Sequence, residues 1–305
     1  MNEQHPDRNF PKHFFWGGST ASHQVEGGNY NQWSVWELEQ AKELAQTAHQ
    51  RLHSLPSWDR IKDKAEEPDN YVSGRGIEHY KRYKEDFAIA QELNLNAFRF
   101  TIEWSRIEPE EGKWDESEVE HYKRYIAALR EKHIEPFLNI WHWTTPVWFA
   151  EKGGFTKKEN RKYFERFVQK IADEFTEDLN YIITLNEPNV YSSFSYLTGE
   201  WPPQQKSMLN FCKVYWNLTR THRESYRILK KAKPSLHVGV AAQLGNIQSK
   251  RPHNVFDNIS TKWMRYFWNW WFLARIKRYQ DFVGINYYFT DYYTGIGKRI
   301  NPSVP

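Results

Sequence analysis

The sequence predicts an α/β fold in which parallel strands alternate with helices around a barrel. Short apolar runs that suit buried strands alternate with longer amphipathic stretches, at intervals of some tens of residues. The alternation by itself fits a doubly wound sheet as well as a closed barrel. However, no Gly-x-Gly-x-x-Gly or Walker-type loop follows the first strand. Polar residues at several strand ends favour a (β/α)8, or TIM, barrel, because such barrels carry their functional groups there.

Six strands are expected from runs of apolar and β-branched residues. They cover residues 14–19, 97–102, 136–140, 181–187, 236–241 and 282–287. Five stretches have apolar residues at helical spacing, namely residues 77–94, 116–132, 158–175, 209–232 and 262–278. Residues 31–76 form a polar, helix-rich excursion between the first two strands. This order requires parallel strands with crossover helices. The prediction is one incomplete barrel domain over residues 1–305, with about six βα units.

The fourth strand is the most informative stretch, because it delivers Asn186 and Glu187 at its end and then meets Pro188. Proline disfavours helical geometry in the preceding residue and stops a strand. A carboxylic acid at the carboxyl end of a core strand is where barrel enzymes place catalytic groups. The run alone leaves open that Glu187 only caps the next segment. Further polar residues that favour the barrel lie on other strands: Arg99, Asn139 and Asn286.

The composition limits the classes of function. The aromatic residues (15 Trp, 18 Tyr and 19 Phe) suit either a ring-packed core or a cleft on which sugar faces or nucleobases stack. The formal net charge is +4, but acidic and basic residues are intermixed without a block of like charges. Nucleic-acid binding needs a clustered basic face, so we expect no nucleic-acid partner.

The chain is expected to be a cytoplasmic protein without a membrane partner. No apolar run approaches the roughly 20 residues that a spanning helix needs. Residues 1–12 are polar and lack the apolar region of a secretory signal.

Five runs of sequence point to a known family. They are residues 10–27, residues 98–107, His142-Trp143 ahead of Pro146, residues 184–188, and residues 281–288. In this order along the chain they resemble motifs of glycoside hydrolase family 1, the retaining β-glycosidases. One such motif is weak evidence, whereas five in the same order argue strongly against chance.

The resemblance implies a role for Glu187 as the general acid/base. It would protonate the leaving oxygen and later deprotonate water, so its pKa should be raised by burial or by a neighbouring negative charge. Gln24, His142 and Asn186 would hydrogen-bond the hydroxyls of the sugar at the cleavage site. Asn186 would reach the 2-hydroxyl, a contact that strengthens in the transition state. Without the family motif, His142 could be a satisfied core histidine, which is the commoner state of a lone histidine.

The resemblance also implies that Arg99, Asn286 and Tyr288 orient the nucleophile carboxylate and keep it ionised. Without the motif, Arg99 could pair with any structural carboxylate and Tyr288 could be plain core. The implied partner is a small carbohydrate, a terminal β-glucoside, β-galactoside or related sugar. No metal or organic cofactor is implied, because two carboxylates suffice for the chemistry.

The sequence departs from the family in two places. An Asp usually follows His-Trp in the family, whereas Thr144 and Thr145 stand here, so we expect altered loop contacts. More seriously, a retaining mechanism needs a second carboxylate about 5 Å from the first. The family places it in a Glu-Asn-Gly run on the seventh strand. This chain contains no such run and ends at Pro305, shortly after its sixth strand.

Three readings of the function therefore remain open. The first is a retaining glycosidase whose nucleophile comes from elsewhere, and the second is a carbohydrate-binding remnant without turnover. The third is an inverting hydrolase that uses Glu103 or Glu200, with carboxyl groups roughly 6.5–9.5 Å apart. An open arc of six strands would expose two strand edges, which favours self-association or a complementing chain at the open edge.

Overall fold

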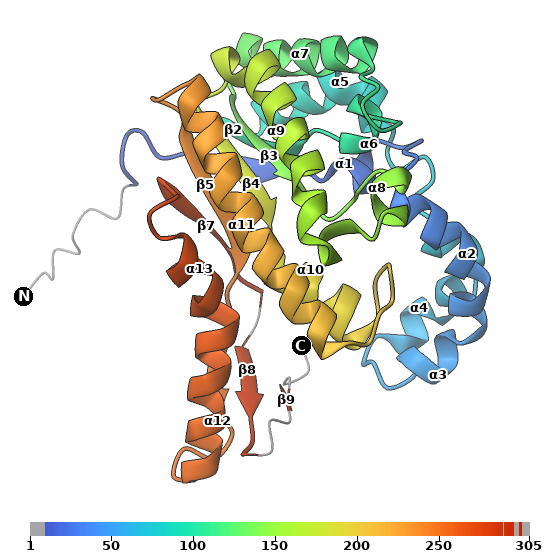
Figure 1. The fold of residues 1–305 in the computed structure, drawn as a ribbon. Helices are drawn as coiled ribbons and strands as arrows, with labels where there is room; N and C mark the ends of the chain where they lie inside the picture. Colours follow the sequence, from blue (N-terminus) through green and yellow to red (C-terminus); the bar gives the residue numbers. More distant parts are fainter. Residues whose placement is uncertain (1–9, 289, 296–298, 301–305) are drawn as a thin grey trace, which may run out of the picture.

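The computed structural model of the protein describes residues 10–288, 290–295 and 299–300. Six strands form one parallel sheet in the order β1-β2-β3-β4-β5-β7. The sheet is curled, and the helices that connect its strands lie along one side of it (Figure 1). The parallel order and the alternation with helices confirm the predicted α/β architecture.

The carboxyl ends of the parallel strands lie along the same edge of the sheet, with a stagger of about two residues between some neighbours. The strands are β1 (Gly17–Ser19), β2 (Ala97–Thr101), β3 (Glu135–Trp141), β4 (Tyr181–Asn186), β5 (His237–Gln243) and β7 (Phe282–Asn286). At the carboxyl edge, Trp141 pairs with Leu185, and Gln243 pairs with Asn286. Residues that follow different strands therefore meet at the same edge of the sheet.

The crossover helices match the predicted helices closely, with one exception. They are α5 (His79–Glu92), α7 (Glu116–Glu131), α9 (Arg161–Phe175) and α11 (Met208–Ala232). Short helices follow several strands: α1 (Ser22–Val25), α6 (Trp104–Ile107), α8 (Val147–Glu151) and α10 (Pro188–Ser192). The exception is the helix expected over residues 262–278, which starts earlier, as α12 (Val255–Arg265), and continues through the π-helix η6 (Tyr266–Trp270) into α13 (Trp271–Ile276).

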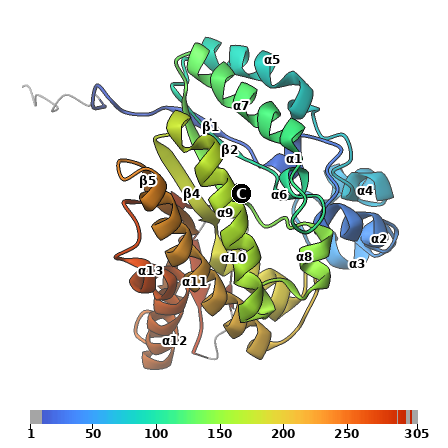
Figure 2. The ribbon, with the colours of Figure 1, turned by 45° about the horizontal axis from the view of Figure 1, so that its top comes forward.

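The excursion between the first two strands is helical, as expected. It contains α2 (Gln32–Gln46), α3 (Ala48–Leu52), α4 (Trp58–Ala65) and the 3-10 turn η1 (Pro68–Tyr71). These helices form a separate group next to α8, as both ribbon views show (Figure 2). The Asn31 side chain caps α2 by accepting a hydrogen bond from the Ser34 N–H (2.9 Å).

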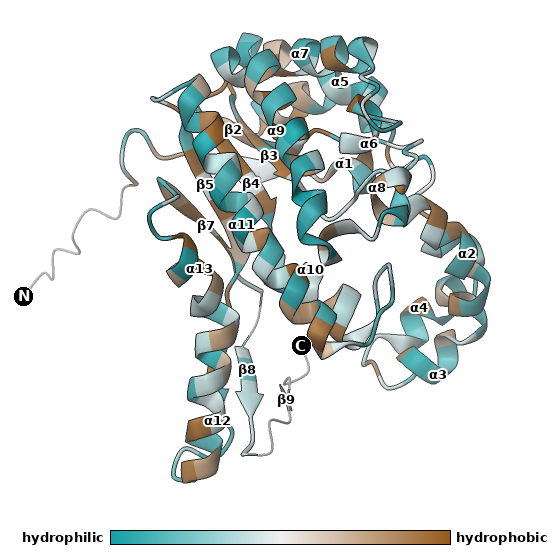
Figure 3. Cartoon of the chain, in the orientation of Figure 1, coloured by the Kyte–Doolittle hydropathy of each residue, from teal (hydrophilic) through white to brown (hydrophobic). Residues whose placement is uncertain are grey.

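The core lies between the sheet and its crossover helices and is rich in aromatic rings. Trp104 stacks on Phe167 with ring centroids 5.2 Å apart, and Phe87 packs edge-on against Tyr125. Hydrophobic residues concentrate in the strands, whereas α7 and α9 carry many hydrophilic residues (Figure 3). Much of the aromatic content therefore fills the core, which is one of the two uses that the composition left open.

A small second sheet was not predicted. It consists of β6 (Asn246–Ser249), β8 (Thr290–Tyr293) and β9 (Arg299–Ile300) and lies beside α12 (Figure 1). Within the described residues, no helix is both long enough and apolar enough to cross a lipid bilayer.

Candidate active site

Glu187 follows the last residue of β4 in a backbone conformation that is unusual for a non-glycine residue. Its φ and ψ are 45° and 60°, in the left-handed region. Its N–H donates to the Ala241 carbonyl of β5 (2.7 Å), which holds the strained turn against the sheet. Pro188 then begins α10, a position where the missing N–H costs nothing. The predicted end of the strand at this proline is confirmed.

The Glu187 side chain is 3% exposed and does not cap α10, although the residue occupies the capping position. Instead, Asn286 Nδ2 donates to Glu187 Oε1 (2.6 Å). The Tyr288 hydroxyl donates to the same oxygen (3.2 Å). The carboxylate of β4 is thus held by side chains at the end of β7.

Burial raises the pKa of Glu187 above its ordinary value. The hydrogen bonds from Asn286 and Tyr288 and the positive charge of Arg99 lower the pKa, but they offset only part of the effect of burial. No carboxylate among the described residues contributes to the shift. A raised pKa favours the protonated form of this carboxyl group, which is the form that a general acid requires.

Asn186 is the hub of the hydrogen-bond network beside Glu187. Its Oδ1 accepts from the Arg99 guanidinium (2.6 Å) and from Asn286 Nδ2 (3.2 Å). Its Nδ2 faces His142 Nε2 at 3.0 Å. Since the Asn186 amide nitrogen can only donate, this contact requires an unprotonated His142 Nε2.

The electrostatics of His142 agree with that assignment. Burial and, to a lesser degree, the charge of Arg99 lower the pKa of His142 to about 3. His142 is therefore neutral and carries its proton on Nδ1, which is buried without a hydrogen-bond partner among the described residues. Burial also lowers the pKa of Arg99 to about 10, against the charge of Glu187, so Arg99 stays charged near neutral pH.

Trp143 belongs to the site, although the sequence assigned it no role. Its indole N–H donates to the Asn186 carbonyl (2.9 Å), and its own backbone is left-handed, with φ 76°. The ring lies against Trp33 and Trp201, with centroids 6.4 and 4.6 Å away. The adjoining His142 was the available signal, because both residues belong to the same short run after β3.

Gln24 stands apart from the other predicted residues. It lies exposed in α1, and no hydrogen bond within the described part of the chain joins it to Asn186 or Glu187. The other six predicted residues form one connected network across β2, β3, β4 and β7. They are Arg99, His142, Asn186, Glu187, Asn286 and Tyr288.

Glu103 and Glu200, considered above as a second carboxylate, are placed differently from Glu187. Glu103 is fully buried, and its two oxygens accept hydrogen bonds from four neutral side chains. These donors are Ser22 (2.7 Å), Asn31 (3.3 Å), Ser105 (3.0 Å) and Thr144 (3.0 Å). Glu200 is exposed in the loop after η5 (Ser193–Thr198). Glu103 therefore serves as a structural anchor.

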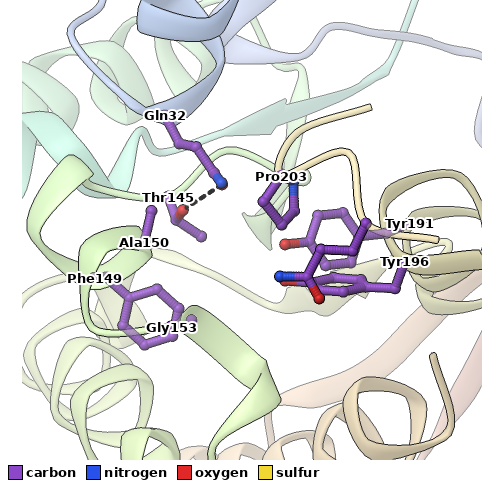
Figure 4. A pocket seen from close by; sticks show the side chains of 10 residues that line it. Gln32, Thr145, Phe149, Ala150, Gly153, Tyr191, Tyr196 and Pro203 are labelled. Carbon is purple, nitrogen blue, oxygen red and sulfur yellow. Dashed lines mark hydrogen bonds between the residues drawn. The ribbon is translucent and has the colours of Figure 1, made fainter. Parts of the chain in front are cut away.

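Both threonines after Trp143 make side-chain hydrogen bonds. Thr144 donates to Glu103, and Thr145 donates to the Gln32 side chain (3.2 Å). Gln32 and Thr145 line a small pocket of about 50 Å³ that also contains Tyr191 and Tyr196 (Figure 4). The loop after β3 is thus tied to α2 through Thr145 and to the Glu187 network through His142 and Trp143.

Comparison with known proteins identifies the family. The model of glycosyl hydrolase family 1 matches residues 6–278. The chain belongs to this family. A 1,4-beta-D-glucan glucohydrolase of Thermotoga neapolitana is 29% identical over 246 residues, covering 78% of this chain and 52% of that protein. Beta-glucosidase A of Acetivibrio thermocellus is 29% identical over 240 residues, covering 77% and 49%. The chain spans about half the length of these curated relatives.

Solved structures of the family share the fold. A beta-glycosidase from Pyrococcus horikoshii superimposes with a TM-score of 0.79 at 30% identity, over 93% of this chain and 64% of that one. A beta-glucosidase from Thermotoga maritima in complex with noeuromycin gives 0.78 at 24% identity, over 97% and 70%. The match confirms the predicted TIM-barrel class, with six strands of the wall present in this chain.

The donor set of the site suits hydroxyl recognition and proton transfer rather than metal binding. Across the part of the chain that the structure describes, no group of three or more His, Cys, Asp or Glu residues could hold a metal ion. The network combines one carboxyl group with neutral amide, imidazole and phenol groups and a single guanidinium. Such a mixture can bind a polyhydroxylated ring while one acid exchanges a proton with it.

Proposed function

We propose that this family 1 protein hydrolyses terminal β-glycosidic bonds of the β-glucoside or β-galactoside type, with retention of configuration and with Glu187 as general acid/base. The observation that carries the proposal is a buried carboxyl group with a raised pKa at the end of a barrel strand. Names of family relatives, such as Beta-glucosidase A, support the substrate class.

The proposed chemistry has two steps. The protonated Glu187 donates its proton to the glycosidic oxygen as the bond to the anomeric carbon breaks and a nucleophile carboxylate bonds to that carbon. Glu187, now ionised, is stabilised by the donors Asn286 and Tyr288. It then removes a proton from the water that displaces the nucleophile.

Sugar binding is assigned to three residues. The Nδ1–H of His142, which is buried and has no hydrogen-bond partner among the described residues, is assigned as a donor to a sugar hydroxyl, and Asn186 supplies an amide beside the acid. Gln24 is exposed and free to extend toward a ligand from α1. The placements of His142 and Asn186 support the roles that the family resemblance implies, whereas Gln24 lies outside their hydrogen-bond network. A cytoplasmic location stays a prediction of the sequence.

The second carboxylate is proposed to come from outside the described residues. Asn286 and Tyr288, which the family resemblance assigns to the nucleophile, contact Glu187 in this chain, as expected if their usual partner is not at hand. The same contacts favour one alternative, a carbohydrate-binding form without turnover, because they tie the acid to its neighbours.

The substitution Glu187→Gln tests the assignment of the acid. We expect hydrolysis of unactivated β-glycosides to be lost, while binding of a neutral sugar analogue persists, because the amide keeps the shape of the side chain but cannot donate the proton. Glu200→Gln is the matched control, since Glu200 is an exposed carboxylate in the loop beyond α10. If turnover survived in the Glu187 variant and disappeared in the Glu200 variant, Glu187 would not be the general acid/base and the proposal would be wrong.

An activity assay on the 305-residue chain by itself tests whether the nucleophile carboxylate comes from outside this chain. We expect it to hydrolyse aryl β-glycosides very poorly by itself, while it still binds sugar analogues weakly. The measurement is single-chain turnover with the product anomer identified by NMR. Fast turnover with retained configuration would show that a second carboxylate of this chain serves as the nucleophile.

A further inference from the structure

A basic cavity lies away from the Glu187 network, between the segment that leads into α9 and the exposed face of α11. Its volume is about 570 Å³. One carboxylate, Glu159, and five basic side chains line it. The basic residues are Lys157, Lys158, Arg161, Lys213 and Arg220.

The charge of this basic cavity is only partly offset by the protein, since Arg161 interacts electrostatically with Glu165, four residues further along α9. Five cations and one carboxylate give it a net charge of +4. This equals the formal net charge of the whole chain, so the charges of all the other residues sum to zero. Within the described residues, none of the five cations lies within ion-pair distance of a carboxylate. Arg161 also begins the 15-residue helix α9, whose first turn contains no acidic residue. The positive end of the helix dipole therefore adds to the same field.

The cations converge because of the geometry of α11. Lys213, Trp216 and Arg220 stand three and four residues apart along the helix, so they share one face. The buried Asn217 donates through Nδ2 to the Phe155 carbonyl (2.8 Å) and fixes α11 against the segment that carries the lysines. The two sets of cations thus line the same cavity.

An aromatic ring forms part of the lining. Trp216 is 42% exposed, although large aromatic rings are usually buried. The Arg220 guanidinium lies over its ring, 5.1 Å from the centroid. Trp271 contacts it edge-on, with centroids 6.2 Å apart. An accessible indole next to clustered cations offers a stacking surface and an anion site side by side.

We propose that this basic cavity binds a small molecule that joins a planar aromatic base to two or more phosphate groups, as in a nucleoside di- or triphosphate. The phosphates would lie among the five cations, and the base would stack on Trp216. The cavity shares no lining residue with the Glu187 network, so this proposal does not depend on the proposed hydrolysis.

Isothermal titration calorimetry on the full chain, without divalent cations, tests the proposal. The probes are ATP, tripolyphosphate and adenosine, each titrated at low and at physiological ionic strength. We expect ATP to bind most tightly, tripolyphosphate less tightly and adenosine least, with affinity for the two anions falling as salt rises. Neutralising two cations, in Lys213→Gln/Arg220→Gln, should weaken ATP binding about tenfold or more.

Two further variants separate the parts of the site. Trp216→Ala should reduce ATP affinity to the level of tripolyphosphate and leave tripolyphosphate binding unchanged. The control Lys84→Gln/Lys231→Gln removes the same charge from exposed positions of α5 and α11 outside the cavity, and should bind ATP as the parent does. Absence of ATP binding, equal weakening by both double variants, or tighter binding of a single-stranded oligonucleotide than of ATP would each overturn the proposal.

Discussion

Protonation of His222, a buried residue of α11, should lower the free energy of unfolding as the pH falls. The ring is fully buried, with Nε2 2.8 Å from the Tyr279 carbonyl and Nδ1 2.6 Å from the Thr184 hydroxyl. A carbonyl can only accept, so Nε2 carries the proton and Nδ1 accepts from Thr184. Both nitrogens are satisfied by a neutral ring, and a second proton would place a positive charge in a dry interior.

The size of the effect follows from the pKa. Burial lowers the pKa of His222 from 6.5 to about 4. The native state thus binds fewer protons than the unfolded state between these values. The stabilisation is complete above about pH 6.5 and is lost as the pH falls toward 4. At about 1.4 kcal/mol for each unit of pKa, it amounts to about 3.5 kcal/mol, an upper figure for a single group.

Urea unfolding of the parent and of His222→Gln, from about pH 7 to about pH 4.5, measures this contribution. Near neutral pH we expect the variant to be less stable by about 1–3 kcal/mol, because it leaves a buried partner unsatisfied. On acidification the parent should lose about 2 kcal/mol more than the variant, so the gap narrows. Replacement of the exposed His253 is the control and should leave the pH dependence of the parent unchanged. If the difference in unfolding free energy between the parent and His222→Gln stayed constant across this pH range, the reasoning would be refuted.

Three other substitutions test the packing around the site. Burial and, to a lesser degree, the charge of Glu103 raise the pKa of Glu26 to about 8. The parent should therefore lose stability as the pH rises from about 4.5 to 8. In thermal melts, Glu26→Gln should make this loss of stability smaller. If the ion pair of Glu26 with Arg106 (3.1 Å) dominates instead, the Gln variant will be less stable at every pH. Glu103→Ala should cost on the order of 3–5 kcal/mol in urea unfolding, since four buried donors lose their acceptor; a cost under about 1 kcal/mol would show that the anchor is dispensable. Trp143→Phe removes the donor to the Asn186 carbonyl and should lower stability by about 1–2 kcal/mol and weaken sugar-analogue binding, whereas unchanged binding would show that Asn186 needs no such support.

Local signals made much of this architecture predictable. The apolar strand before Asn186 and the proline after Glu187 mark the end of β4, and helical spacing marks α7, α9 and α11 within a few residues. These features depend on neighbours in the sequence, so periodicity and turn chemistry were sufficient to find them.

Features that depend on distant contacts were harder to predict. The three-stranded sheet pairs β6 with β8 across about 40 residues of chain, and its strands are too short to show a pattern. The early start of α12 did have a signal, because Asn254 caps it by accepting from the Asp257 N–H. The contacts of Asn286 and Tyr288 with Glu187 could not be read from strand order, since they depend on which carboxylate is within reach.

The parallel order of the sheet limits what could close the wall between β7 and β1. Neighbouring strands that run in the same direction cannot be joined by a tight turn, so each added strand must arrive through a long crossover. Two further strands, which would bring the six strands of the described residues to the eight of a closed barrel, amount to a complete βαβ unit of about 30 residues or more. A short peptide or a hairpin would therefore leave a gap, and only a folded segment of that size could complete the ring.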